Sequence, residues 1–160
     1  MKPVHPLLVH FPIALLFLSV TADLVAFFTD STSLRSTGWW ALNAAALGGV
    51  LTVAAGLYDM RRATLQEDVH HLVHQHMKVG LGLLASIVGL TLWRWTADAQ
   101  PEHSVTAIYL DVALLTMALA GFQGWLGGEL VYSHGVFVQD AAAGAGADKD
   151  PKHAKGHHQH

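Results

Sequence analysis

The sequence of 160 residues contains no cysteine. The chain therefore cannot form disulfides, thiolate metal sites, iron–sulfur clusters or the covalent attachments of c-type haem. Charged residues make up only 13% of the chain, against about 25% in an ordinary soluble domain. The net charge of −3 and the lack of a basic stripe argue against a nucleic-acid partner. The sequence also lacks a phosphate-binding loop, a nucleophile triad and paired catalytic carboxylates, so any catalysis would have to come from a cofactor.

Long apolar runs are abundant instead, and 52% of the residues are hydrophobic. Four segments each approach the length of about 20 residues that crosses about 30 Å of hydrocarbon. They cover approximately residues 7–28, 38–58, 77–95 and 105–126. A backbone in lipid must satisfy its own hydrogen bonds, so these segments are expected to be helices. We expect an all-α fold, an integral membrane four-helix bundle over residues 1–138, and a disordered histidine-rich tail over residues 139–160.

The first segment is expected to stay in the mature chain. Asp23 lies inside it, and the stretch FFTDSTS is a poor signal-peptide cleavage site. The polar stretches TDSTSLRSTG, DMRRATLQEDVHHLVHQ and TADAQPEHS separate the segments, and the middle one can extend the third helix into the interface. Trp39, Trp40, Trp93 and Trp95 lie at segment ends, as in an aromatic belt.

Threading four spans puts both termini on one side, which we call the near side. Its flanks carry Lys2, Arg61, Arg62 and Lys78, whereas the far-side flanks carry Arg35 and Arg94. The excess of Lys and Arg favours a cytoplasmic near side. We therefore expect a multi-pass protein of the bacterial inner (cytoplasmic) membrane with cytoplasmic termini.

Histidine is the most unusual component, because 12 histidines outnumber the nine Lys and Arg together. The threading brings histidines from three segments to the near side: His5, His10, His70, His71, His74, His76 and His134. Histidine without cysteine suits haem, copper or zinc.

The spacing of these histidines limits which of them can bind the same metal ion. On a continuous helix His70 and His74 share a face, whereas His76 points in another direction. His5 and His10 would be roughly 140° apart and could not easily hold one ion from the same face. The first helix is expected to begin near Pro6 or near Pro12, because proline fits best in a first turn.

The candidate ligands follow from this near-side group. We expect a metal to be held by some of His5, His10, His74, His76 and His134, with His70 as a further cofactor-binding candidate. His10 lies about a turn deeper than His5. We therefore predict that it holds the more buried cofactor, with His74 or His76 as its partner on the third helix. His5 and His134 would serve a shallower site or close over the first.

Two further features favour haem over a bare ion. Glycines of the second and third spans leave room for a flat macrocycle, although they equally permit close helix packing: Gly48, Gly49, Gly56, Gly80, Gly82 and Gly89. Arg61, Arg62 and Lys78 lie where haem propionates would need cations, although they can equally be topology signals. Zinc more usually recruits carboxylates beside histidine, and Asp59, Glu67, Asp68 and Glu129 are available.

A second group of polar residues falls toward the far side, one on each span: Asp23, Asn43, Arg94 and Asp111. Charged residues inside a membrane usually pair or face the interior of the bundle. A structural pair of Arg94 with Asp111 or Asp23 is one interpretation. A path for protons or a quinone head group is the alternative.

The two ends of the chain carry long motifs, HPLLVHFPIALLFLSVTADL and GWLGGELVYSHGV. These resemble a bacterial membrane-protein family known as domain of unknown function 2231. Its members share an opening H-P-L-L-V-H-F-P, a central histidine before the third span and a closing G-G-x-L-V-Y-x-H-G. The resemblance covers the chain except for its tail and implies a four-helix membrane domain. By this resemblance His5, His10 and His134 match family positions, and the central histidine is one of those in HHLVHQHM.

The leading functional hypothesis is a b-type cytochrome that binds one or two non-covalent haems through paired histidines. It would act as a membrane oxidoreductase, passing electrons between a quinol pool and a redox protein. The alternatives are a copper- or zinc-handling protein with the tail as a collecting arm, or a structural membrane protein without a cofactor. Small-residue helix faces, such as Gly124 with Gly128, would allow a homodimer.

Overall fold

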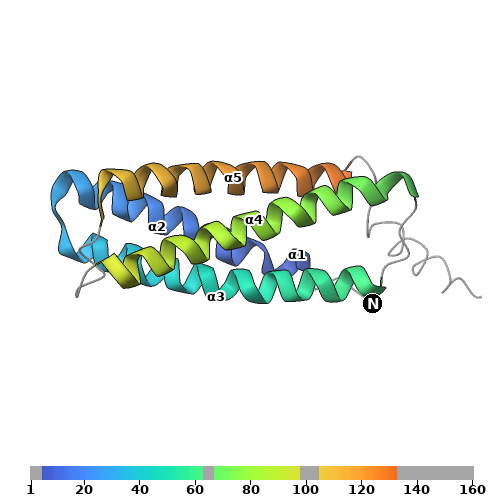
Figure 1. The fold of residues 1–160 in the computed structure, drawn as a ribbon, viewed down its shortest axis with the longest axis horizontal. Coiled ribbons are helices and arrows are strands. Elements are labelled where there is room, and N and C mark those ends of the chain that lie inside the picture. Colours follow the sequence, from blue (N-terminus) through green and yellow to red (C-terminus); the bar gives the residue numbers. More distant parts are fainter. Residues whose placement is uncertain (1–4, 63–66, 98–104, 133–160) are drawn as a thin grey trace, which may run out of the picture.

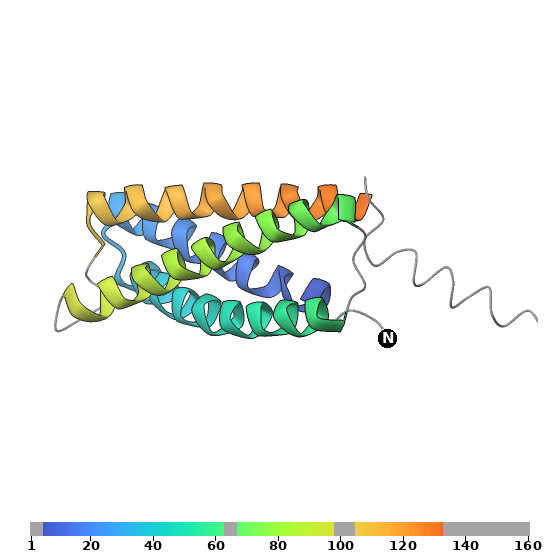
Figure 2. The same ribbon diagram turned by 45° about the vertical axis from the view of Figure 1, so that its right-hand side comes forward.

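The computed structural model describes residues 5–62, 67–97 and 105–132. The helices are α1 (His5–Leu8), α2 (His10–Thr29), α3 (Thr32–Arg62), α4 (Glu67–Ala97) and α5 (Ala107–Tyr132). The four long helices lie alongside one another in an elongated bundle (Figure 1, Figure 2). Stretches long and apolar enough to cross a membrane cover His10–Thr29, Thr32–Arg61, His71–Thr96 and Ala107–Leu130. The expected all-helical bundle with four candidate spans is therefore confirmed, and the protein is a multi-pass membrane protein.

The first span begins with two helices separated at Val9. The Val9 N–H donates to the His5 carbonyl oxygen at 3.1 Å. Pro12 lies in the first turn of α2, where a missing N–H leaves no helical hydrogen bond unmade. Val9 itself has α-helical dihedral angles, so the backbone stays helical between α1 and α2, and His5 lies on the one-turn α1.

The turn between α2 and α3 is shorter than the polar stretch TDSTSLRSTG predicts. It contains two residues, because Asp30 adopts the left-handed conformation with φ 54° and ends α2. Aspartate tolerates this conformation better than most residues. The Ser31 hydroxyl then accepts a hydrogen bond from the Leu34 N–H at 3.4 Å, and α3 begins at Thr32.

The core of the bundle is apolar and continuous across the long helices. Its centre contains Leu16, Val20, Leu42, Leu90 and Leu110. The most extensive helix–helix packing joins α2 to α3. Large apolar side chains also cover the outside of the bundle, and Leu115 is 70% exposed. An apolar outer surface of this kind matches a lipid bilayer as the surrounding solvent.

The two ends of the bundle differ in the elements that they contain. At the near end lie α1, the starts of α2 and α4, and the ends of α3 and α5 (Figure 1). The opposite ends of the long helices form the far end. The arrangement therefore brings together the segments that carry the near-side histidines.

We predict that reporters fused after Asp30 and after Gln100 lie on one side of the membrane, and that reporters fused after Met60 and at the C-terminus lie on the other. The physical reason is the antiparallel threading of four spans. We expect the near end to face the cytoplasm, because Arg61 and Lys78 are exposed there. Opposite locations for Met60 and the C-terminus would contradict the threading, whereas a periplasmic near end would contradict only the orientation.

Candidate functional site

Polar groups from four helices meet inside the near end: three side chains and, from Thr52, the backbone carbonyl. We define the near-end cluster as His5 of α1, Thr52 of α3, His76 of α4 and Gln123 of α5. Thr52 is 5% exposed and Gln123 is 7% exposed, whereas His5 and His76 are half-buried. Polar groups enclosed in this way need partners within the protein.

His5 is held by two hydrogen bonds to α3. Its backbone N–H donates to Asp59 Oδ2 at 2.9 Å, and its ring Nδ1 lies 3.0 Å from the Thr52 carbonyl oxygen. A carbonyl oxygen can only accept, so Nδ1 carries the proton and Nε2 keeps its lone pair. Gly56 makes this position possible, because a Cβ there would lie 3.0 Å from the ring. The orientation of His5 is therefore set by α3.

His76 is held by Gln123. The amide Nε2 of Gln123 lies 3.1 Å from His76 Nε2 and 3.1 Å from the His76 carbonyl oxygen. Because the amide nitrogen can only donate, His76 Nε2 accepts and His76 Nδ1 carries the proton. Neither His76 Nδ1 nor Gln123 Oε1 has a hydrogen-bond partner within the described residues, although both atoms are buried.

The two histidine rings meet directly. Their centres are 6.1 Å apart and their planes are perpendicular. The ring of His76 packs against Gly127, where a Cβ would lie 3.3 Å from its Cε1. Of the four central histidines that the sequence leaves open, the structure brings His76 to His5.

The structure also gives the exposure of other predicted near-side residues. Arg61, His71 and Lys78 are exposed, and His74 is half-buried. His10 is exposed, whereas His5 is half-buried and hydrogen-bonded to α3. Their five-residue spacing places the two rings roughly 140° apart on a helix. The side chains of Arg62 and His70, and the whole of His134 and the 139–160 tail, lie outside the described residues.

Carboxylates do not complete a larger ligand set in the part of the chain that the structure describes. No group of three or more His, Asp and Glu side chains is arranged there to hold an ion. Asp59 instead accepts the His5 backbone N–H. The described donor set therefore consists of two imidazoles with polar neighbours.

The glycines that could have left room for a macrocycle mostly face neighbouring side chains. Gly48 lies against Pro12 and Phe11, and a Cβ at Gly49 would lie 3.0 Å from Leu84. A Cβ at Gly80 would lie 2.9 Å from Gln123 Nε2. These glycines permit close helix packing and, near the cluster, make space for its polar side chains. Gly82 and Gly89 face outward, with no described atom within 4 Å of a Cβ.

Sequence reasoning singled out neither Thr52 nor Gln123. Each is one polar residue inside a long apolar span, and polar residues inside membrane spans usually have a role. That signal could have identified Gln123. Nothing in the sequence shows that the backbone carbonyl of Thr52 orients His5.

The far end contains a separate, fully buried ion pair. Arg94 Nη1 donates to both carboxylate oxygens of Asp23, at 3.0 and 2.8 Å, and both side chains are 0% exposed. The Tyr109 hydroxyl donates to Asp23 Oδ2 at 3.2 Å. Arg94 Nη2 donates to the Arg35 carbonyl oxygen at 3.1 Å. One ion pair thus ties all four long helices together.

Aromatic rings enclose the guanidinium of Arg94. It lies 5.6 Å from the ring centre of Trp39 and 5.5 Å from that of Tyr109, both within cation–π range. Trp39 is 8% exposed, so it belongs to this enclosure and not to an interfacial belt. Asp111, the other predicted partner of Arg94, is exposed.

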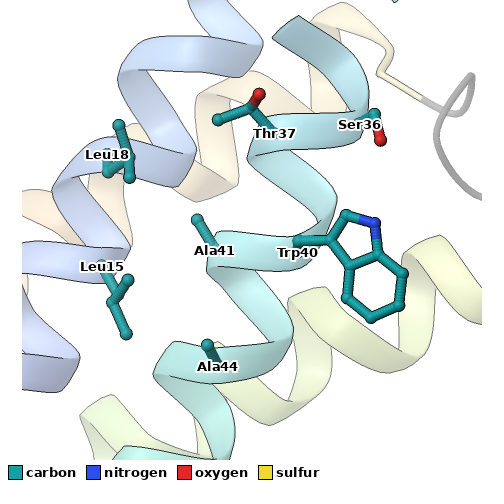
Figure 3. Close-up of a pocket in the computed structure, with 7 residues that line it drawn as sticks. All are labelled: Leu15, Leu18, Ser36, Thr37, Trp40, Ala41 and Ala44. Atoms are coloured by element: carbon teal, nitrogen blue, oxygen red, sulfur yellow. The ribbon is translucent and has the colours of Figure 1, made fainter. Parts of the chain in front are cut away.

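A shallow groove of about 420 Å³ lies on the outside of α2 and α3. Figure 3 shows Leu15 and Leu18 of α2 beside Ala41 of α3, with the Trp40 ring on the other side. Its lining includes neither the cluster residues nor the Asp23–Arg94 pair. The groove is therefore separate from both polar sites.

Comparisons with known proteins identify a family of predicted membrane proteins. The family model described as a predicted membrane protein, DUF2231, matches residues 1–140. This range includes all five helices. No curated protein and no solved structure matches the chain.

Proposed function

Because this chain belongs to the DUF2231 family of predicted membrane proteins, we propose a function from its near-end cluster: non-covalent binding of haem b between His5 and His76, for electron transfer in the membrane. The proposal rests on one observation. Two imidazoles from α1 and α4 meet inside the near end, without a third described side chain suited to ligate an ion.

The number of ligands supports haem over zinc. A structural zinc site takes four protein ligands and a catalytic one takes three, usually including cysteine or carboxylate. Haem iron takes its equatorial ligands from the macrocycle and needs only axial ligands from the protein. A pair of histidines is therefore a complete set for haem iron and an incomplete one for zinc.

The geometry of the pair also supports a shared metal. A shared metal would be held by one ring nitrogen of each histidine, and the ring centres of His5 and His76 are already only 6.1 Å apart. Ligating histidines usually donate their other ring N–H to a carbonyl or carboxylate, and His5 does so to the Thr52 carbonyl oxygen.

Room for the macrocycle has to come from a movement of the protein. Gly56, Gly80 and Gly127 face His5, Gln123 and His76 themselves, so these glycine positions are filled. A bare copper ion needs no comparable space. This observation favours copper binding by the same two rings as the second candidate function.

The remaining residues of the near end have supporting roles in this proposal. Haem iron, when bound, supplies one-electron chemistry. Arg61 and Lys78 are exposed at the near end, where they can pair with propionates. A quinol or a redox protein is the proposed electron donor or acceptor. Gly124, which faces outward on α5, supports a homodimer through a small-residue face.

We predict that His5→Ala and His76→Ala each remove most of the haem that co-purifies with the chain in detergent. Each substitution takes away one of two ligands, whereas His71→Ala removes an exposed histidine of the same helix α4 and should leave haem content unchanged. The measurements are haem per chain and the b-type band in a reduced-minus-oxidised spectrum.

The haem and copper content of the wild-type chain distinguishes the two candidate functions. A missing b-type band in protein produced with ample haem would contradict haem binding. Copper bound at one ion per chain, and lost in both variants, would then support the second candidate. Absence of both cofactors would leave the cluster a structural one.

A further inference from the structure

Gln123 occupies an unusual position beside His76. The residue is only 7% exposed, and its Oε1 has no partner among the described residues. Its amide nitrogen, by contrast, makes two contacts, both to His76. A buried acceptor left without a partner is costly. The orientation of this amide therefore calls for an explanation.

The backbone contact fixes which way the amide faces. The His76 carbonyl oxygen can only accept, so the amide nitrogen must lie toward it. The same nitrogen then presents its second hydrogen to His76 Nε2 at 3.1 Å. His76 Nε2 is thereby kept unprotonated, and the ring proton is placed on Nδ1.

We propose that Gln123 is a positioning residue that sets the tautomer of His76. In the arrangement seen here, His76 presents an N–H at Nδ1. The opposite tautomer would require the amide to leave the His76 carbonyl oxygen and turn Oε1 to the imidazole, which would move the proton to Nε2 and leave a lone pair at Nδ1. Gln123 Oε1 and His76 Nδ1, which have no partner among the described residues, would then be usable.

This second arrangement links the inference to the proposed function. If a metal binds at His76 Nδ1, Gln123 Oε1 becomes the acceptor for the opposite ring N–H, the usual partner of a ligating histidine. Only this step rests on the proposed function. The tautomer assignment stands on the hydrogen bonds of the chain alone.

Two substitutions test the assignment from different sides of the amide. Gln123→Leu removes the donor, and Gly80→Ala places a Cβ 2.9 Å from the amide nitrogen and forces it to move. Gly82→Ala is the matched control, because the described residues leave open space there. The readout is the ¹⁵N signature of the His76 ring in the full chain, without added cofactor, at a pH where the imidazole is neutral. His76→Ala identifies its signals.

The wild-type chain and Gly82→Ala should show an unprotonated Nε2 and a protonated Nδ1. In Gln123→Leu and in Gly80→Ala, the Nδ1–H form should lose its dominance. An unchanged signature in both would overturn the inference, because a packing role alone does not select a tautomer. Gln123→Leu should also weaken binding of added haem or copper by about 10–100-fold. If the tautomer changes in the two variants but the wild-type chain binds neither haem nor copper, the proposed function is contradicted and this inference stands.

Discussion

Asp23→Asn is expected to remove most of the folded protein from the membrane. The substitution preserves the shape of the side chain but removes the carboxylate charge that pairs with Arg94 at a position with 0% exposure. Removing one partner of a buried ion pair costs about 3–5 kcal/mol. A typical free energy of unfolding is about 5–15 kcal/mol. The loss should be seen as a lower yield of folded protein and an earlier thermal transition in detergent.

Two further variants separate this effect from a general sensitivity to charge removal. Asp30→Asn breaks the exposed ion pair between Asp30 and Arg35 and should change stability by less than about 1 kcal/mol. The double variant Asp23→Asn with Arg94→Gln should recover much of the loss, because both charges of the buried pair are removed together. The role assigned to the pair would be wrong if Asp23→Asn alone were as stable as the wild type.

Gly38→Ala is expected to destabilise the bundle although it adds one methyl group. A Cβ at Gly38 would lie 2.6 Å from Asp23 Cγ. The carboxylate cannot move aside, because Arg94 and Tyr109 hold both of its oxygens. The two helices are also joined there by the Ser19 hydroxyl, which donates to the Gly38 carbonyl oxygen at 2.7 Å. Overpacking of this kind costs about 1–3 kcal/mol.

Replacing Gly89 with alanine should instead increase the free energy of unfolding. Within the described residues nothing lies within 4 Å of a Cβ there. Replacing a glycine inside a helix with alanine stabilises it by up to about 1 kcal/mol. Thermal unfolding of both variants in one detergent provides the comparison. Equal shifts for Gly38→Ala and Gly89→Ala would show that the contact with Asp23 does not limit helix approach.

The four spans could be predicted because the thickness of the hydrocarbon fixes their length. Their ends could not, because polar residues continue a helix once it leaves the apolar layer. Arg35 and Glu67 illustrate this, since both are helical in stretches that the composition assigns to breaks. Asp30 ends α2 by adopting the left-handed conformation. The length of an apolar run does not predict such a conformation at a single residue.

The near-end group of histidines followed from the threading, but the pair that meets did not. His5 lies against α3 and is hydrogen-bonded to it, whereas His10, roughly 140° around the helix, is exposed. On the far side the sequence left two partners open for Arg94. The structure pairs it with Asp23, while Asp111 is exposed. Which residues meet depends on the rotation of each helix about its axis. A helix that is apolar on nearly all sides gives little sequence information about that rotation.

The ion pair at the far end also imposes an order on biosynthesis. Asp23 is made 71 residues before Arg94 and 86 residues before Tyr109. At about 5–20 residues per second, Asp23 is synthesised roughly 4–14 s before its cation. During that interval α3 is the only later span available to accompany α2, and these two helices pack most extensively in the finished bundle. The nascent α2–α3 hairpin therefore has to shelter a carboxyl group until the third span arrives to neutralise it.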